Sequence, residues 1–299
     1  MNASTHAGTH PSAAPHGGHY YVPQPSIYPF VLATGMFLLA LGFILKMNHF
    51  APGPYVMLGG AGVIVYVLFK WFGAVIYENK TGAYTDWEDR SFRHGMIWFI
   101  GSEVMFFVAF FGALFYTRNI SVPILSGLEA AHGYTIWPGF GEGAWNVAGV
   151  GPKGTPFTPV SAWGIPALNT ALLLTSGATL TWAHWGLLKN NRGQLKLGLA
   201  LTVALGVLFL GFQAYEYHHA YTELGLTLSA GVYGATFFML TGFHGFHVTL
   251  GAIMLSVILA RSVAGHFDAD RHFAFEAVAW YWHFVDVVWL LLFVLVYWL

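Results

Sequence analysis

The stretch FIGSEVMFFVAFFG, from Phe99 to Gly112, is apolar enough to lie in lipid and yet carries Glu103 near its middle. An ionisable group in hydrocarbon costs about 3 kcal/mol even on the milder insertion scales, so this carboxyl group needs a reason to be there. Outward from this stretch, the chain holds seven apolar runs, each long enough as a helix to cross a bilayer core of about 30 Å. They cover residues 29–47, 53–78, 94–117, 165–188, 195–216, 229–260 and 274–299. The sequence therefore predicts an all-α, polytopic membrane protein with seven transmembrane helices.

The composition supports this fold class. Of the 299 residues, 56% are hydrophobic and only 8% are charged, whereas soluble domains have about 25% charged residues. Basic and acidic residues nearly cancel and form no basic block, which argues against a nucleic-acid partner. Because the chain has no cysteine, it can form no disulfide, thiolate metal site or thiol nucleophile. Any chemistry must use histidines, carboxylates or hydroxyl groups.

Three polar segments separate the apolar runs into blocks. Residues 1–28 read as a disordered tail, in which four histidines offer at most a loose metal-binding tract. Residues 79–93 form an inner loop between the first pair of spans, 29–78, and the remaining five spans within 94–299. Residues 118–164 form a long outer loop rich in glycine, proline and aromatic residues, which we interpret as a compact cap. The tail histidines are His6, His10, His16 and His19.

The basic residues predict the orientation of the chain, because inner loops carry the excess of lysine and arginine. Eight of them lie in the loops after the second, fourth and sixth spans, and three lie on the other side. This bias places the N-terminus inside and the C-terminus outside. Together with the lack of a transit peptide, it predicts a bacterial inner (cytoplasmic) membrane protein. The eight are Lys80, Arg90, Arg93, Lys189, Arg192, Lys196, Arg261 and Arg271, and the three are Lys46, Arg118 and Lys153.

Ionisable side chains at mid-depth are the candidate site. Glu103 lies roughly 14 Å from the inner end of its span, at a rise of about 1.5 Å per residue. Its neighbours on the same helix face are phenylalanines, so its hydrogen-bond partners must come from other helices. The two last spans carry ionisable groups at a similar depth, which predicts a buried polar layer. Its members are Glu103, His244, His247, Glu276, His283 and Asp286.

Three interpretations of this layer remain open. It is a satisfied network that fixes the helix register, or a proton-handling chain of the kind that serves pumps, or a metal or haem site in which His244 and His247 act with Glu103. Outside the layer, we place Glu216 at the outer interface without a special function. Glu78 and Arg261 lie at inner helix ends, where they face water or lipid headgroups.

Six motifs identify a family resemblance. SEVMFF, TWAHW, QAYEY, VYGATFF, FHGFHV and the C-terminal FEAVAWYWHFVDVVWLLLFVLVYW follow one another along the predicted spans. In this order they closely resemble subunit III of the haem-copper cytochrome c oxidases, from about Tyr28 to the end of the chain. The chain departs from the family pattern at Tyr84-Thr85, where relatives commonly have His-Thr, and in the lead into the third span, TDWEDRSFRHGM.

The resemblance implies a two-helix hairpin and a five-helix bundle separated by a lipid-filled cleft. It implies an accessory subunit of a proton-pumping oxidase that packs mainly on subunit I and contacts subunit II. Haem and copper belong to those partner subunits, so we expect no cofactor, no metal and no catalytic residue in this chain. Phospholipid is expected to bind, and the resemblance implies that its headgroups lie near Glu78, Arg261 and His266.

Further implied roles are stabilisation of the catalytic subunit and support of proton uptake. Two alternatives of another class are kept: a free-standing proton or solute transporter, and a membrane enzyme that holds a metal or haem on histidine and glutamate. The chain shows neither an internal repeat nor a pair of broken helices, which weakens the transporter alternative.

Overall fold

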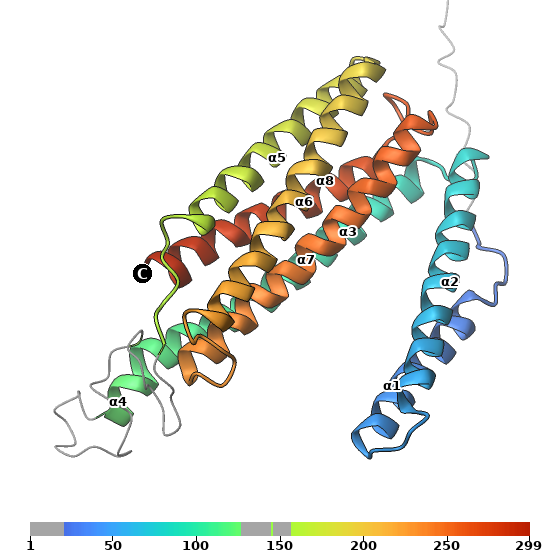
Figure 1. Cartoon of the computed structure of the whole chain (residues 1–299). Helices are drawn as coiled ribbons and strands as arrows, with labels where there is room; N and C mark the ends of the chain where they lie inside the picture. Colours follow the sequence, from blue (N-terminus) through green and yellow to red (C-terminus); the bar gives the residue numbers. More distant parts are fainter. Residues whose placement is uncertain (1–20, 127–144, 146–156) are drawn as a thin grey trace, which may run out of the picture. The chain divides into compact units, whose positions relative to one another are not determined.

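The computed structural model describes residues 21–126, 145 and 157–299, and all regular structure among these residues is helical (Figure 1). The predicted all-α fold class is thereby confirmed. The histidine-containing part of the tail and most of the predicted outer loop lie outside the described residues. The elements are α1 (Tyr28–Met47), α2 (Gly53–Lys80), α3 (Asp86–Tyr116), η1 (Thr117–Ser121), α4 (Val122–Ser126), α5 (Ile165–Leu188), α6 (Arg192–Thr222), α7 (Val232–Val263), α8 (Phe273–Leu292) and η2 (Phe293–Trp298).

Six helical segments among the described residues are long and apolar enough to cross a membrane. They are α1, α2, the continuous α3–η1–α4 segment, α6, α7 and the continuous α8–η2 segment. The remaining predicted span, the fourth along the chain, corresponds to α5, whose 24 residues reach about 36 Å. It is less apolar because it carries polar residues that the bundle buries, Asn169 and Ser176 among them. Hydropathy alone undervalues a helix that faces protein.

Several helices extend beyond the apolar runs. The third helix begins at Asp86, within the segment assigned to an inner loop. A capping box explains this start: the backbone N–H of Thr85 donates to Glu88 at 2.8 Å, and the Thr85 hydroxyl contacts the same carboxylate. At the other end, the helical conformation continues through η1 and α4 to Ser126, where an irregular loop was expected. Apolar content marks only the part of a helix that faces lipid or protein, not its polar ends.

The chain divides into two compact units, residues 1–90 and 91–299. In the first unit, α1 and α2 pack closely along a row of four glycines. A Cβ on Gly42 would lie 2.4 Å from the backbone nitrogen of Met57, and one on Gly60 would lie 2.6 Å from that of Leu39. Small residues let the two backbones approach, which is how membrane helices associate without a hydrophobic driving force. The other two glycines are Gly35 and Gly53.

In the second unit, α5 packs on α6, α6 on α7, α7 on α8, and α8 returns to α5. Figure 1 shows these four long helices running alongside one another. Trp282 lies at the centre with no exposed surface. Its indole ring occupies the space beside Gly206 and Gly251, where a Cβ would come within 2.8 and 2.7 Å of the ring. Its Nε1–H donates to the Ser176 hydroxyl at 2.8 Å, so the largest core side chain is also hydrogen-bonded.

Candidate functional site

Glu103 on α3 is paired with His247 on α7. The distance from Glu103 Oε2 to His247 Nε2 is 2.8 Å, and His247 Nδ1 lies 2.7 Å from the Phe243 carbonyl. A carbonyl only accepts, so Nδ1 carries a proton, and a further proton must lie between Nε2 and the carboxyl group. The pair is electrically neutral wherever that proton resides, which lowers its cost in a low-dielectric environment. The sequence-based prediction that Glu103 finds its partner on another helix is confirmed.

The pair also reaches α8, because the Tyr281 hydroxyl donates to the His247 carbonyl at 3.3 Å. Aromatic rings surround it: the ring centroids of Phe107 and His247 are 5.0 Å apart, and Phe106 lies 5.8 Å from the same ring. The Glu103 side chain is 22% exposed and that of His247 9%. Glu103, His247 and Tyr281 therefore form a polar contact between α3, α7 and α8 that consists of two hydrogen bonds.

His244 is not part of this pair. It is 1% exposed and lies between Phe209, 5.9 Å away by ring centroids, and Trp289, 5.2 Å away. Both of its ring nitrogens are buried without a hydrogen-bond partner among the described residues. Within that part of the chain, no group of three potential metal ligands includes Glu103, His244 or His247.

His283 and Asp286 on α8 face α5. His283 Nδ1 lies 3.8 Å from Asp286 Oδ2, and His283 Nε2 lies 3.5 Å from the Thr181 hydroxyl. Gly177 of α5 makes room for the carboxylate, because a Cβ there would lie 2.6 Å from Oδ2. The residues grouped by the sequence as one layer therefore occupy separate places along the bundle.

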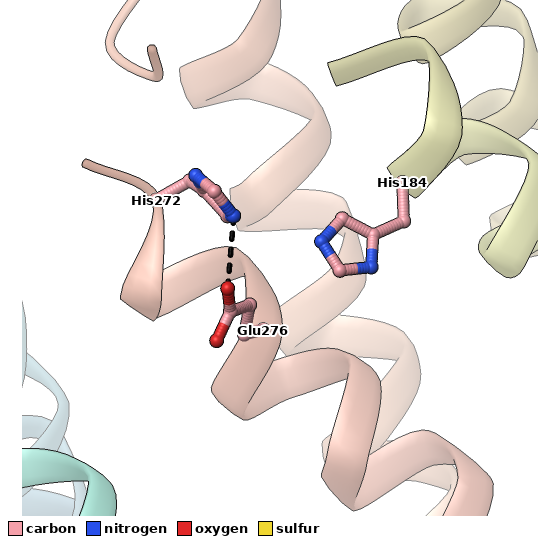
Figure 2. A group of neighbouring side chains, drawn as sticks. All are labelled: His184, His272 and Glu276. Carbon is pink, nitrogen blue, oxygen red and sulfur yellow. Dashed lines mark ion pairs between the residues drawn. The ribbon is translucent and has the colours of Figure 1, made fainter. Parts of the chain in front are cut away.

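Glu276 belongs to a third group, at the end of the bundle where α8 begins. Its Oε1 lies 2.8 Å from Nε2 of His272, the residue just before α8, and its Oε2 contacts Arg93 of α3. His184 of α5 points toward the same two side chains (Figure 2). One ligand atom from each of His184, His272 and Glu276 lies within 4.8 Å of the others. Sequence reasoning missed both histidines, because they lie 88 positions apart in the chain and each stands alone in its motif.

Glu216, which the sequence placed at the outer interface, is buried within the bundle. It is 2% exposed, and its Oε1 accepts hydrogen bonds from the Tyr297 hydroxyl at 2.7 Å and from Gln213 Nε2 at 3.1 Å. The physical reason is that α6 continues to Thr222, which moves its true end beyond Glu216, and that η2 packs its aromatic side chains against α6 and α7. The predicted span ends at residue 216, so the sequence did not predict that Glu216 lies within α6.

The residues assigned to headgroups lie at helix ends in both units. Glu78 accepts a hydrogen bond from the Tyr84 hydroxyl at 2.6 Å. Burial and this carboxylate raise the pKa of Tyr84. Arg261 lies over the ring of Phe267, 4.5 Å from its centroid, and its buried Nε has no hydrogen-bond partner among the described residues. The backbone N–H of His266 donates to the Arg261 carbonyl at 3.0 Å, which holds the two residues at the same end of α7.

These features define a polytopic helical membrane protein whose deeply placed ionisable groups largely pair within the chain. Residues 18–299 match the family model described as cytochrome c oxidase subunit III. The chain is 41% identical over 279 residues to cytochrome c oxidase subunit 3 of Prototheca wickerhamii, which covers 93% of this chain and 96% of the relative. It is also 41% identical over 280 residues to that of Marchantia polymorpha, with coverage of 93% and 96%, and 40% identical over 285 residues to that of Formosania lacustris, with coverage of 95% and 98%.

The chain belongs to the cytochrome c oxidase subunit III family. Membership makes it a subunit of a respiratory oxidase complex with other oxidase subunits. The family resemblance predicted from the six motifs is confirmed.

Proposed function

We propose that this chain is an accessory subunit, without a redox centre of its own, of a proton-pumping cytochrome c oxidase. It packs mainly on subunit I, contacts subunit II, binds phospholipid, stabilises the catalytic subunit and supports proton uptake. Haem and copper reside in the partner subunits. The observation that carries this proposal is the pairing of Glu103 with His247. Glu103 and His247 hold each other, and among the described residues no third potential metal ligand lies close enough to complete a metal site with them.

Proton handling by the same pair is the competing interpretation. Two features favour the structural one. The imidazole of His247 is packed against aromatic rings, and among the described residues His247 is the only side chain that hydrogen-bonds the Glu103 carboxyl group. A neutral, hydrogen-bonded pair fixes the register of α3 against α7. Any support of proton uptake then acts through the position of the subunit, not through Glu103 as a carrier.

Exposed apolar surface supports a role as a packing subunit. In the most apolar 18-residue stretch of each of α1, α2 and α3, only 11% is buried inside the protein. The corresponding share is 33–50% for α6, α7 and α8. On α3, large side chains such as Trp98, Met105 and Phe115 are 77%, 65% and 62% exposed. These surfaces are covered in the membrane by lipid tails and by the partner subunits.

Arg261 is the strongest candidate for a headgroup contact. Its guanidinium group has no carboxylate within ion-pair distance among the described residues, although it lies at the end of a membrane helix. An unpaired arginine at this depth is favourable next to an anionic phosphate. His266 stands beside it, and Glu78 serves the corresponding role at the end of α2. We place the chain in a bacterial cytoplasmic membrane with its N-terminus inside, as the distribution of basic residues favours.

Purification in mild detergent tests the function. A tagged chain should be isolated with haem-bearing subunits and show their absorption spectrum, and the chain separated from them should lose it. If the tagged chain is purified without haem-bearing subunits from membranes that have oxidase activity, the proposal is contradicted. A haem spectrum that remains with the separated chain would also contradict it.

Lipid binding has its own test. Arg261→Ala should lower the phospholipid phosphorus retained per haem in the purified oxidase and shorten its lifetime during turnover, because the phosphate loses its cationic partner. Lys189→Ala is the matched control, since Lys189 is exposed at the end of α5 on the same proposed side of the membrane. Equal lipid content in the two variants would count against the role of Arg261.

A further inference from the structure

We propose that His184, His272 and Glu276 form a Zn²⁺ site that joins the end of α5 to the start of α8. His184 lies on α5, Glu276 on α8 and His272 just before α8. The two helices pack against each other, and Figure 2 shows the three side chains converging. This is the only group of three or more potential metal ligands found among residues 21–126, 145 and 157–299. It departs from the expectation, drawn from the sequence, that the chain holds no metal.

The distances suit a small tetrahedral ion. Two imidazole nitrogens and one carboxylate oxygen around Zn²⁺, with metal–ligand distances of about 2.0–2.2 Å, lie about 3.3–3.5 Å from one another. The three ligand atoms lie within 4.8 Å of one another, and His272 Nε2 is 2.8 Å from Glu276 Oε1. The 2.8 Å pair must open by roughly 0.6 Å, and a side-chain movement of at most about 1.5 Å closes the longest gap. His184 is free to make it, because its Nε2 is buried without a hydrogen-bond partner among the described residues.

The donor set favours zinc among the divalent cations. Two neutral imidazoles and one carboxylate form a set typical of zinc sites with a fourth position open to water. Calcium and magnesium prefer sites made of oxygen ligands, so they fit poorly here. Without cysteine in the chain, softer thiolate chemistry is excluded.

Neighbouring groups already orient two of the ligands. His272 Nδ1 lies 3.1 Å from the Asp268 carbonyl, so Nδ1–H donates there and Nε2 faces the site. Arg93 contacts Oε2 of Glu276, so Oε1, which is paired with His272 Nε2, is the oxygen that turns to the metal. Binding of the ion displaces the proton held between these two atoms. Such outer partners fix the orientation of metal ligands and are a normal part of zinc sites.

Water has access to the site, and the carboxyl end of α5 partly offsets the positive charge of Arg93. The site lies at an end of the bundle, where Arg93 is 34% and Glu276 14% exposed, so that water reaches it. His184 lies in the last turn of α5, where the carboxyl end of a helix contributes negative partial charge. The bound ion would connect two helices of the same unit and so oppose their separation.

The test uses the purified oxidase complex with its four tail histidines replaced by serine, so that binding in the tail does not contribute. Zinc binding is measured by competition with a chromophoric chelator, together with the melting temperature of the complex. His184→Phe keeps an aromatic ring beside Phe275, 5.2 Å away by ring centroids, but offers no ligand. We expect it to weaken zinc binding by more than about 100-fold, because loss of an outer partner alone costs roughly 10–100-fold. Zinc should raise the melting temperature of the parent complex and not of this variant.

His218→Phe is the matched control, because His218 is exposed near the other end of α6 and lies outside the cluster. It should bind zinc as the parent does. Equal zinc binding by parent and His184→Phe would overturn the site. If His184→Phe fails to assemble, zinc-edge anomalous scattering from crystals of the parent complex decides. A peak about 2.0–2.2 Å from all three ligand atoms supports the site, and its absence overturns it.

This result is independent of the proposed function. A chain that is isolated with haem-bearing subunits but binds no zinc would lose only the zinc site. A chain isolated without them would contradict the oxidase role, while its zinc binding could still be measured.

Discussion

The α1–α2 hairpin and the α5–α8 bundle hold membrane helices together by different means. In the hairpin, backbones meet at glycines, and the structure shows no hydrogen bond between side chains of α1 and α2. In the bundle, polar side chains bond across the helix interfaces, among them Trp282 to Ser176, Trp289 to Thr170 and Thr179 to Thr202. Lipid tails are as apolar as leucine, so apolar area alone cannot drive either association. The comparison shows that one chain uses two other contributions to helix association, which are close packing in the hairpin and interhelical hydrogen bonds in the bundle.

The two mechanisms bury different amounts of surface. The most apolar 18-residue stretches of α1 and α2 are 11% buried, and that of α8–η2 is 50% buried. Two helices that meet along one glycine row leave their other faces exposed. A helix surrounded by several others needs polar partners on more than one side. The hairpin should therefore respond mainly to steric changes, and the bundle to loss of volume or of polar partners.

Truncation of the central tryptophan should have the largest effect. Trp282→Ala removes a fully buried ring that fills the space beside two glycines and leaves a cavity that costs about 3–5 kcal/mol of unfolding free energy. Unfolding in mixed detergent micelles, followed by circular dichroism, measures it. Trp98→Ala is the control, because Trp98 is 77% exposed and should change stability by less than about 0.5 kcal/mol. Similar losses in both variants would show that the bundle does not depend on this packing.

A single methyl group should test the glycine row. Gly60→Ala places a Cβ 2.6 Å from the backbone nitrogen of Leu39, and we expect the overpacking to cost about 1–3 kcal/mol. Gly59→Ala is matched in helix and chemistry, yet its Cβ meets nothing within 4 Å. Amide hydrogen exchange of α1 and α2 should accelerate in the first variant only. Unchanged exchange in Gly60→Ala would mean that the hairpin tolerates wider separation.

The smallest effect is expected at Glu103. Glu103→Gln keeps an amide oxygen and an N–H within reach of His247 Nε2, so stability should change by less than about 1 kcal/mol. Oxygen reduction and proton pumping by the assembled complex should stay within about twofold. Glu103→Ala is the informative companion, because it leaves Nε2 of His247 without a partner and should destabilise by about 1–3 kcal/mol. Loss of pumping in the glutamine variant would favour the proton-handling interpretation.

The apolar runs of the sequence predicted the helices well, because lipid exposure demands long uninterrupted apolar stretches. They did not predict the polar ends, such as the start of α3 at Asp86, although the pattern Thr85 to Glu88 carries a capping signal. The sequence showed that the hydrogen-bond partner of Glu103 must lie on another helix, and His247 was among the residues proposed for the same polar layer. The sequence did not reveal which faces of the helices contact one another, because nearly every face is apolar.

The separation of the polar residues into groups shows the same limit. The depth of a side chain along its helix follows from its residue number. The neighbouring helix toward which the side chain points depends on how the helices pack. His283 and Asp286 face Gly177, and Glu276 faces His272 and Arg93, because of how α8 rotates against α5 and α3. The His184 group joins residues from loops and helix ends far apart in sequence. Only coordinates bring such residues together.

The space beside Gly177 constrains how this protein can change over time. A methyl group there would collide with Oδ2 of Asp286, and the carboxylate is enclosed, with 8% of its side chain exposed. Alanine at 177 therefore requires the Asp286 carboxylate either to shift or to be replaced. The two positions are therefore coupled, so that the residue at 286 determines how well a side chain at 177 is accepted.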